Sequence, residues 1–385
     1  MLCAAAAGPC KLATPQSTSG LTRSLIMAAR ENTRAKVLGK ALKEMRPRTR
    51  EALSWHQRDK VSSAWLLAIP GYETSLTNAE FAEAAATNLC LPSPACAGRV
   101  GETIKGRTKV DAHGDNLQST ALQGDHWRKR HDGILHLLHR LCMWSGIPAD
   151  MEVFNLFSHL VRQQGLSRLE RFKQRQSMTP DMRISLPHRD GTSHVLHELK
   201  VISRSKTRYK PTWDRRAVDI RASNLEHEYI MKARAADSKY NGTPKGEVGR
   251  VEAKMVELCP VKGIVCGNFG EVSESTHELI AAMATSRVRI AGPKRGRRGH
   301  PRGEDAERSL AVSSIRRKLG VATVKAQAFS LLARLEMIGP GTAAAMGRRR
   351  QAGELERLWL REEQAMALAN KQGWRAFRTG FAKTD

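Results

Sequence analysis

Two short motifs, separated by the length of a hairpin, constrain the fold of this chain more than any other feature. Asp181 follows a proline, Glu198 and Lys200 lie in the sequence Glu-Leu-Lys, and sixteen residues separate the two acids. That spacing is enough for two strands and a tight turn. The sequence therefore places two carboxylates and one ammonium group close together, within a chain that is otherwise strongly basic.

The segments on either side of the intervening turn have strand-like patterns. The first, PDMRISLP, alternates apolar and polar residues, which is the period of a half-buried strand. Asp190-Gly191 is a dipeptide typical of tight hairpin turns. The second segment, SHVLHELKVIS, is apolar apart from its histidines and the Glu/Lys pair, as expected of a central strand covered on both faces. Because side chains two apart on a strand share a face, Glu198 and Lys200 point the same way, and a twisted hairpin brings Asp181 beside them.

This trio has the composition of a metal-dependent catalytic site. Two neighbouring carboxylates repel each other, and a hard cation such as Mg2+ or Mn2+ relieves that repulsion by taking oxygen ligands. Such a cation polarises a phosphoryl oxygen, and an ammonium group stabilises charge that develops in the transition state. We therefore predict Asp181 and Glu198 as metal ligands and Lys200 as a catalytic partner. The alternative is that Asp181 caps a turn and the other two form a solvated pair on an edge strand.

The charge of the chain indicates the class of its partner. It carries 64 Lys and Arg against 38 Asp and Glu, a formal net charge of +26. Such an excess favours a polyanionic partner, and phosphate neutralisation by basic residues releases counterions. DNA is the expected partner, with RNA as the alternative. No apolar run approaches the ~20 residues needed to span a bilayer, so no membrane is expected. The oligomeric state stays open.

The cysteines and the N-terminal segment indicate the compartment. Seven scattered cysteines without a secretory signal fit a reduced intracellular compartment better than a disulfide framework. The basic composition favours the nucleus. The first thirty residues lack any acid and are rich in Ala, Ser and Thr, so they also resemble an organelle transit peptide, with an unstructured tail as the alternative.

The order of the predicted elements indicates an α/β fold. We expect a helix over 125–145, a strand over 150–157, the hairpin over 179–203, a helix over 214–240, a strand over 261–268 and a helix over 274–284. Two further helices are predicted over 304–337 and 342–372. The expected organisation is a disordered tail (1–20), a helical N-terminal region with a loop-rich part over 91–124 (21–124), the core (125–290), a basic linker (291–303) and a helical basic C-terminal region (304–385).

With these motifs, residues 60–290 resemble the restriction-like PD-(D/E)xK endonuclease domain that follows the reverse transcriptase in non-LTR retrotransposons, and its stand-alone protist relatives. The resemblance rests on Pro180-Asp181, Glu198-Leu199-Lys200, Arg130-His131-Asp132 and the segment WLLAIP. It implies a restriction-endonuclease-like core (helix, mixed sheet, helix) with helical N- and C-terminal extensions, which cleaves DNA phosphodiester bonds with Mg2+.

The resemblance also implies catalytic roles for His131 and Asp132, through contact with the scissile phosphate or completion of the metal shell. An ordinary helix N-terminus with a favourably placed acid is the alternative. Glu152, on the strand after that helix, is a candidate additional acid, although an ordinary surface position is equally compatible with the sequence.

The chain departs from the family at the zinc knuckle that usually precedes the core. Cys90, Cys96 and His113 remain, but Asn116 occupies the position of the next histidine and no cysteine follows before Arg130. A structural zinc site needs about four N or S ligands, so zinc is not expected. This degeneracy leaves open a decayed nucleic-acid-binding protein, or an RNA or ribonucleoprotein interaction protein, with a nuclease-like fold.

Basic residues near the motifs and in the linker are the candidates for phosphate contact. A row of cations directly follows the second strand, and such contacts position a nucleic acid without reading its sequence. The predicted nucleic-acid-binding residues are Arg130, Arg204, Lys206, Arg208, Lys210, Lys294, Arg295, Arg297 and Arg298. A solvated loop is the alternative for the row from residue 204 to 210.

Overall fold

The structure is a computed structural model, and it describes the chain from residue 59 to 338 with several gaps. The described ranges are 59–71, 74–122, 125–152, 156–162, 167, 178–188, 191–204, 216–257, 261–292 and 303–338. The predicted tail, the linker cations at 294–298 and the predicted helix over 342–372 lie outside these ranges. The described part belongs to one unit, Ser54–Asp385, and has a mixed α/β fold, as predicted.

A four-stranded mixed sheet forms the centre of the fold. Its order is β3 (Ala149–Met151), β4 (Met182–His188), β5 (Gly191–Val201) and β6 (Lys262–Cys266). The first three strands are antiparallel neighbours, and β6 runs parallel to β5. The predicted hairpin is therefore present as β4 and β5, which are paired as far as His188 and Gly191.

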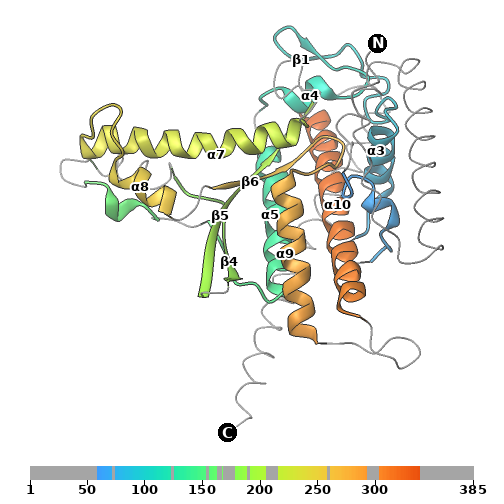
Figure 1. The fold of residues 1–385 in the computed structure, drawn as a ribbon. Helices are drawn as coiled ribbons and strands as arrows, with labels where there is room; N and C mark the ends of the chain where they lie inside the picture. Colours follow the sequence, from blue (N-terminus) through green and yellow to red (C-terminus); the bar gives the residue numbers. More distant parts are fainter. Residues whose placement is uncertain are drawn as a thin grey trace, which may run out of the picture. The chain divides into compact units, whose positions relative to one another are not determined.

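Helices cover both faces of this sheet (Figure 1). On one face, α5 (His126–Trp144), α9 (Glu274–Ala291) and α10 (Glu304–Met337) share an apolar core with Met182, Ile184 and Leu199. On the other face, α7 (Ala217–Ala236) and α8 (Arg250–Glu257) pack with Leu196 in a second core. The strand β5 thus lies between two apolar layers, as its near-continuous apolar sequence predicts.

Most predicted core elements are confirmed, with small shifts at their ends. The helix over 125–145 is α5, which ends at Trp144. Gly146, two residues later, has a φ of +69°, in the left-handed region where glycine commonly terminates a helix. The helix over 214–240 is α7, and a π-helical turn, η3 (Asp237–Asn241), extends it. The strand over 150–157 is the shorter β3, and the helix over 274–284 is the longer α9.

Other elements were not predicted. The stretch 91–124, expected to be a loop, contains the small hairpin of β1 (Thr103–Lys105) and β2 (Thr108–Lys109) and the short helix α4 (Asp115–Ser119). The helix α8 and the 3-10 turns η1 (Ala64–Leu67) and η2 (Ser158–Leu160) are further additions. The helix α3 (Asn78–Asn88) lies in the region predicted to be helical, and Thr77 and Glu80 form a capping box at its N-terminus.

The long helix α10 is part of the core. We placed it in a C-terminal region outside 125–290, but Ala311, Ile315 and Leu319 pack in the same core as α5 and α9. In its second half, α10 packs against η1 and α3. Among the described residues, no helix is both long and apolar enough to cross a membrane.

Gly263 on β6 permits the close approach of α7 to the sheet. A Cβ atom at this position would lie 2.7 Å from the Cα atom and 2.9 Å from the carbonyl oxygen of Ala222 on α7. Both neighbours are backbone atoms, which cannot move without displacing the helix. Gly263 is also paired in register with Glu198, so this contact sets how closely α7 covers the candidate site.

We expect Gly263→Ala to destabilise the protein by about 1–3 kcal/mol, the usual cost of overpacking a core. Urea unfolding followed by circular dichroism measures this change. Gly71→Ala is the control, because an added Cβ there lies 3.6 Å from its nearest neighbour, the Thr74 Oγ1 atom, which is an ordinary contact. Equal midpoints for Gly263→Ala and the wild type would contradict the close contact.

Candidate active site

Asp181 is held at the start of β4 by two contacts to its carboxylate. Its Oδ2 atom accepts a hydrogen bond of 2.7 Å from the backbone N–H of Leu199, and lies 3.1 Å from Nε2 of His131. The N–H that donates this bond belongs to the residue between Glu198 and Lys200. The structure therefore brings the two sequence motifs together at one place on the hairpin.

Glu198 and Lys200 share one face of β5, whereas Leu199 is buried in the opposite core. The Nζ atom of Lys200 donates to Oε1 of Glu198, and the hydroxyl of Tyr229 donates to Oε2 at 2.7 Å. The Glu198 side chain is 8% exposed and that of Lys200 is 37% exposed. A buried carboxylate with an accessible ammonium group beside it is suited to hold a cation or an anionic substrate at the surface.

His131 connects α5 to this group. Its Nδ1 lies 3.0 Å from Oδ1 of Asp132, so both ring nitrogens face carboxylates. Burial alone would lower the pKa of His131, but the hydrogen bonds and negative charges of Asp181 and Asp132 outweigh burial and raise that pKa above its usual value. The geometry thus favours an imidazolium that donates to both acids.

The same contacts keep Asp181 ionised. Burial would raise the pKa of this carboxyl, but the hydrogen bond and charge of His131, the charge of Lys200 and the N–H of Leu199 together lower it below its usual value. At neutral pH the group is therefore a carboxylate, which is the form that binds a metal ion.

Two α7 residues that the sequence did not indicate as site residues complete the group. Tyr229 is buried and joins Glu198 to α7, and burial together with the charge of Glu198 raises the pKa of its phenol, which keeps the hydroxyl protonated as a donor. The Nζ atom of Lys232 lies 4.4 Å from the centre of the Tyr229 ring. A tyrosine in a predicted helix carries no signal of this role, because the contact depends on how α7 packs over the sheet.

Glu152 lies beside Asp181 through its backbone. Its N–H donates to the carbonyl oxygen of Asp181 at 2.9 Å, and its φ of +49° is unusual for a residue other than glycine. Its side chain is exposed. The residue therefore belongs to the rim of the group, where an additional acid was considered.

The donor set suits a hard cation that keeps water ligands. Among the described residues, no group of three or more His, Cys, Asp and Glu side chains forms a metal site by itself. Magnesium is commonly held by one or two carboxylates, with water and substrate phosphate completing its shell. Asp181 fits that mode, since it uses only Oδ2 in the contacts above, whereas Glu198 would have to give up one of its contacts with Lys200 and Tyr229 to share a metal ion.

Two of the predicted phosphate-binding residues have other contacts. Arg130 is 8% exposed, and its guanidinium donates to Ser203 and Gln327, each at 3.0 Å, and to the carbonyl of Val201. Burial, reinforced by the charge of Arg334, lowers its pKa to about 10. Arg130 therefore ties α5 to β5 and α10, and its contact with phosphate stays a prediction.

Arg204 forms an ion pair of 2.7 Å with Asp115 of α4, and its side chain is 24% exposed. It joins the end of β5 to the N-terminal region instead of projecting into solvent. The other predicted phosphate-binding residues lie outside the described residues: Lys206, Arg208, Lys210, Lys294, Arg295, Arg297 and Arg298.

The segment that resembles a zinc knuckle is organised by hydrogen bonds. The Asp111 carboxylate accepts the backbone N–H groups of His113, Asp115 and Asn116 and so begins α4. The His113 ring lies 3.1 Å from the carbonyl of Leu91. Cys96 is fully buried, and burial raises the pKa of its thiol to about 11, so it is a protonated core residue.

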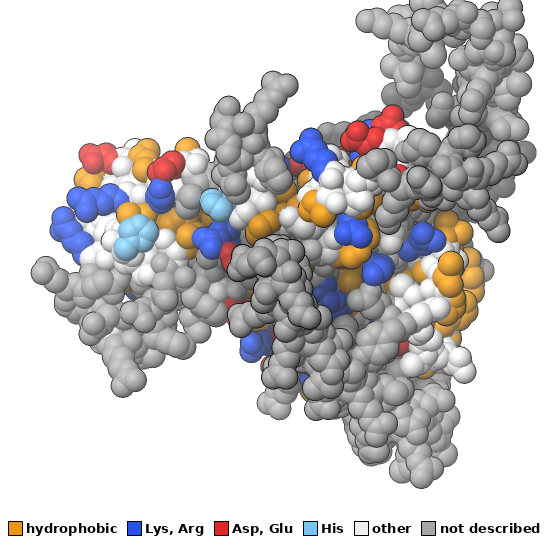
Figure 2. Space-filling model, turned by 90° about the horizontal axis from the view of Figure 1, so that it is seen from below, with side chains coloured by type: hydrophobic (Ala, Val, Ile, Leu, Met, Phe, Trp, Pro, Cys, Tyr) orange, Lys and Arg blue, Asp and Glu red, His pale blue; other side chains and the backbone are white. Residues whose placement is uncertain are grey.

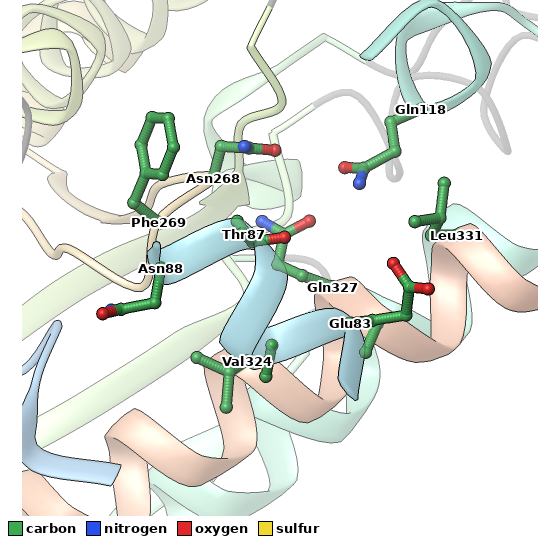
Figure 3. Close-up of a pocket in the computed structure, with 11 residues that line it drawn as sticks. Glu83, Thr87, Asn88, Gln118, Asn268, Phe269, Val324, Gln327 and Leu331 are labelled. Atoms are coloured by element: carbon green, nitrogen blue, oxygen red, sulfur yellow. The ribbon is translucent and has the colours of Figure 1, made fainter. Parts of the chain in front are cut away.

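A small pocket with polar and apolar lining lies away from the candidate site, between α3, α4, α10 and the loop after β6 (Figure 3). The amide side chains of Gln118, Asn268 and Gln327 project toward it, together with Glu83. Its water-sized space is about 10 Å³, which suits a single water molecule. It shares no lining residue with the group around Asp181.

No protein-family model, curated protein or solved structure matches this chain. The functional assignment below therefore rests on the motifs and on the geometry of the site.

Proposed function

We propose that this protein is a metal-dependent endonuclease that hydrolyses phosphodiester bonds in DNA. One observation carries the proposal: Asp181, Glu198 and Lys200 meet on one hairpin, with Asp181 bonded to the N–H between the other two. Two motifs that are each common by chance thus meet in an arrangement that suits metal-dependent phosphodiester hydrolysis, with two carboxylates beside an accessible ammonium group.

Each residue has a defined task in this proposal. Asp181 and Glu198 would hold Mg2+ or Mn2+, which when bound polarises the phosphoryl group under attack. Lys200, partly exposed beside Glu198, stabilises negative charge that develops on the phosphate. His131 orients the Asp181 carboxylate from α5, and Tyr229 orients that of Glu198 from α7.

The order of elements supports a restriction-endonuclease-like core of retroelement descent. A helix, a strand, the carboxylate-bearing hairpin, a second helix and a parallel strand follow one another as α5, β3, β4–β5, α7 and β6. In this interpretation α3, α4 and α10 are additions around the core. A fold of this kind hosts many functions, so the site and not the fold carries the activity.

The distribution of basic side chains supports a polyanionic substrate. Lys232, Lys239, Lys245 and Arg250 are exposed on α7, on α8 and between them. Figure 2 shows Lys and Arg side chains and histidines, interspersed with Asp and Glu and with hydrophobic side chains, at the end of the molecule where Figure 1 places α7 and α8. Lys232 is the member of this set that lies at the Tyr229 ring beside the site.

Metal removal tests the proposal. We expect the purified protein to nick supercoiled plasmid in the presence of Mg2+ or Mn2+ and to lose this activity completely with EDTA, because two adjacent carboxylates without a cation repel the phosphate. Restored nicking after excess Mg2+ is the control for irreversible damage by the chelator. Nicking that persists in EDTA would contradict a metal-dependent site.

The alternative is a nucleic-acid-binding protein whose nuclease core has decayed. It is favoured by Glu198, both of whose oxygens have partners within the protein. It predicts DNA binding whose logarithmic affinity falls linearly with the logarithm of salt concentration, without any metal-dependent product. The same plasmid assay, combined with binding at several salt concentrations, distinguishes the two functions.

A further inference from the structure

An exposed tryptophan lies one helical turn from the candidate site. Trp127, in the first turn of α5, is 57% exposed. His131 follows it by four residues, so the two side chains lie on the same helix face, about 6 Å apart at their Cβ atoms. Because His131 contacts Asp181 at 3.1 Å, Trp127 lies at the rim of the group that holds Asp181.

Trp127 differs from the two other tryptophans that the structure describes. Trp65 is buried and meets the Phe81 ring at 5.9 Å, and Trp144 carries the Arg287 guanidinium at 4.6 Å from its ring. Among the described residues, neither a ring nor a cation stacks on Trp127. A large aromatic side chain that is left open beside a candidate site has a face available for a ligand.

Basic residues follow Trp127 in the same turn of α5. Arg128 has a side chain that is 62% exposed and pairs with Asp132 at 3.4 Å, and Lys129 comes next. Lys200 is 37% exposed in the site itself. Sites for single-stranded nucleic acid combine a positively charged surface with aromatic side chains on which bases stack. The charge matches a polyanion and disfavours an apolar protein partner.

We propose that Trp127 stacks on an unpaired base next to the phosphate bound at Asp181 and Glu198. A base within an intact duplex has both faces covered by its neighbours, so the preferred substrate carries single-stranded nucleotides at the cleaved position. The statement about cleavage rests on the proposed function, whereas the stacking contact itself needs no cleavage.

Binding with Ca2+ in place of Mg2+, to a single-stranded oligothymidylate and to a duplex of the same length, tests the stacking contact while a cation still offsets the charge of the two carboxylates. We expect Trp127→Ala to bind the single strand roughly tenfold or more weakly, as one lost base stack requires. Trp127→Phe should retain most of the affinity, because a phenyl ring also stacks. Binding of the duplex should change much less in both variants.

Tryptophan fluorescence gives a second readout. The single strand should quench the wild-type emission, and Trp127→Phe should lose most of this quenching while it still binds. Trp144→Ala is the matched control, because Trp144 lies at the other end of α5, about 25 Å away. Wild-type affinity and quenching in both Trp127 variants, or equal losses in Trp144→Ala, would overturn the proposal.

Cleavage of a flapped duplex with Mg2+ separates this inference from the proposed function. Faster cleavage at the junction than in a fully paired duplex, with the preference reduced in Trp127→Ala, supports both. Trp127-dependent quenching without any cleavage would leave the stacking contact standing and overturn the nuclease. If Trp127→Ala cleaves at the junction with the same preference as the wild type, the stacking contact is overturned and the nuclease assignment stands.

Discussion

Asp181→Asn is expected to lower the rate of DNA cleavage by about 1,000-fold or more while leaving DNA binding intact or slightly tighter. A metal ion contributes several kcal/mol to the stabilisation of the transition state, and each 1.36 kcal/mol corresponds to about tenfold in rate. The asparagine can still accept the N–H of Leu199, so the hairpin should keep its geometry. Removal of a negative charge near the phosphates accounts for the tighter binding.

Single-turnover cleavage at saturating protein, with binding measured in parallel, checks this expectation. Asp150→Asn is the matched control, because Asp150 lies on the neighbouring strand β3, is 59% exposed and forms an ion pair with Arg183 of β4. It should cleave at the wild-type rate. Equal cleavage rates for Asp181→Asn and the wild type would contradict the assignment of Asp181 as a metal ligand.

Lys200→Met should lower the cleavage rate by about 100-fold to 1,000-fold, the usual loss when one preorganised charge-stabilising donor is removed. The methionine retains the length of the side chain but removes the charge that faces Glu198 and the substrate. DNA binding should lose about one phosphate contact, so the slope of the logarithm of affinity against the logarithm of salt concentration should fall by about one. The loss should therefore appear in the rate of the bound complex.

Lys262→Met is the control for this substitution. Lys262 lies on the adjacent strand β6, is 40% exposed and forms an ion pair with Glu278. Like Lys200, it is thus a partly exposed lysine on a central strand that pairs with a glutamate. It faces α9, on the other side of the sheet from α7. Rates that fall equally in both lysine variants would mean that the effect comes from surface charge and not from the site.

The central hairpin and its carboxylates could be predicted because their geometry is local. Alternation with period two fixes which side chains share a face, and the spacing between Asp181 and Glu198 fixes a short connection. The capping box of α3 and the stop of α5 before Gly146 are also local signals. Each depends on residues within a few positions of one another.

The missed features depend on packing between distant segments. The sequence predicts that Arg130 binds nucleic acid and gives no sign of its contact with α10, whose Gln327 lies 197 residues away in sequence. Tyr229 reaches Glu198 only because Gly263 admits α7 close to the sheet. The sequence of α10 predicts a helix but does not indicate which helices it packs against, so its place in the core with α5 and α9 could not be predicted either.

The most direct test of the nuclease assignment is nicking of supercoiled plasmid by the wild type and by Glu198→Gln, compared at equal DNA occupancy in Mg2+. Glutamine preserves the shape of Glu198 and can still accept from Tyr229, so the fold should be kept. We predict open-circular product from the wild type and none from the variant above the EDTA background. Equal nicking by both proteins, or binding without nicking by either, would contradict a catalytic site built on Asp181, Glu198 and Lys200.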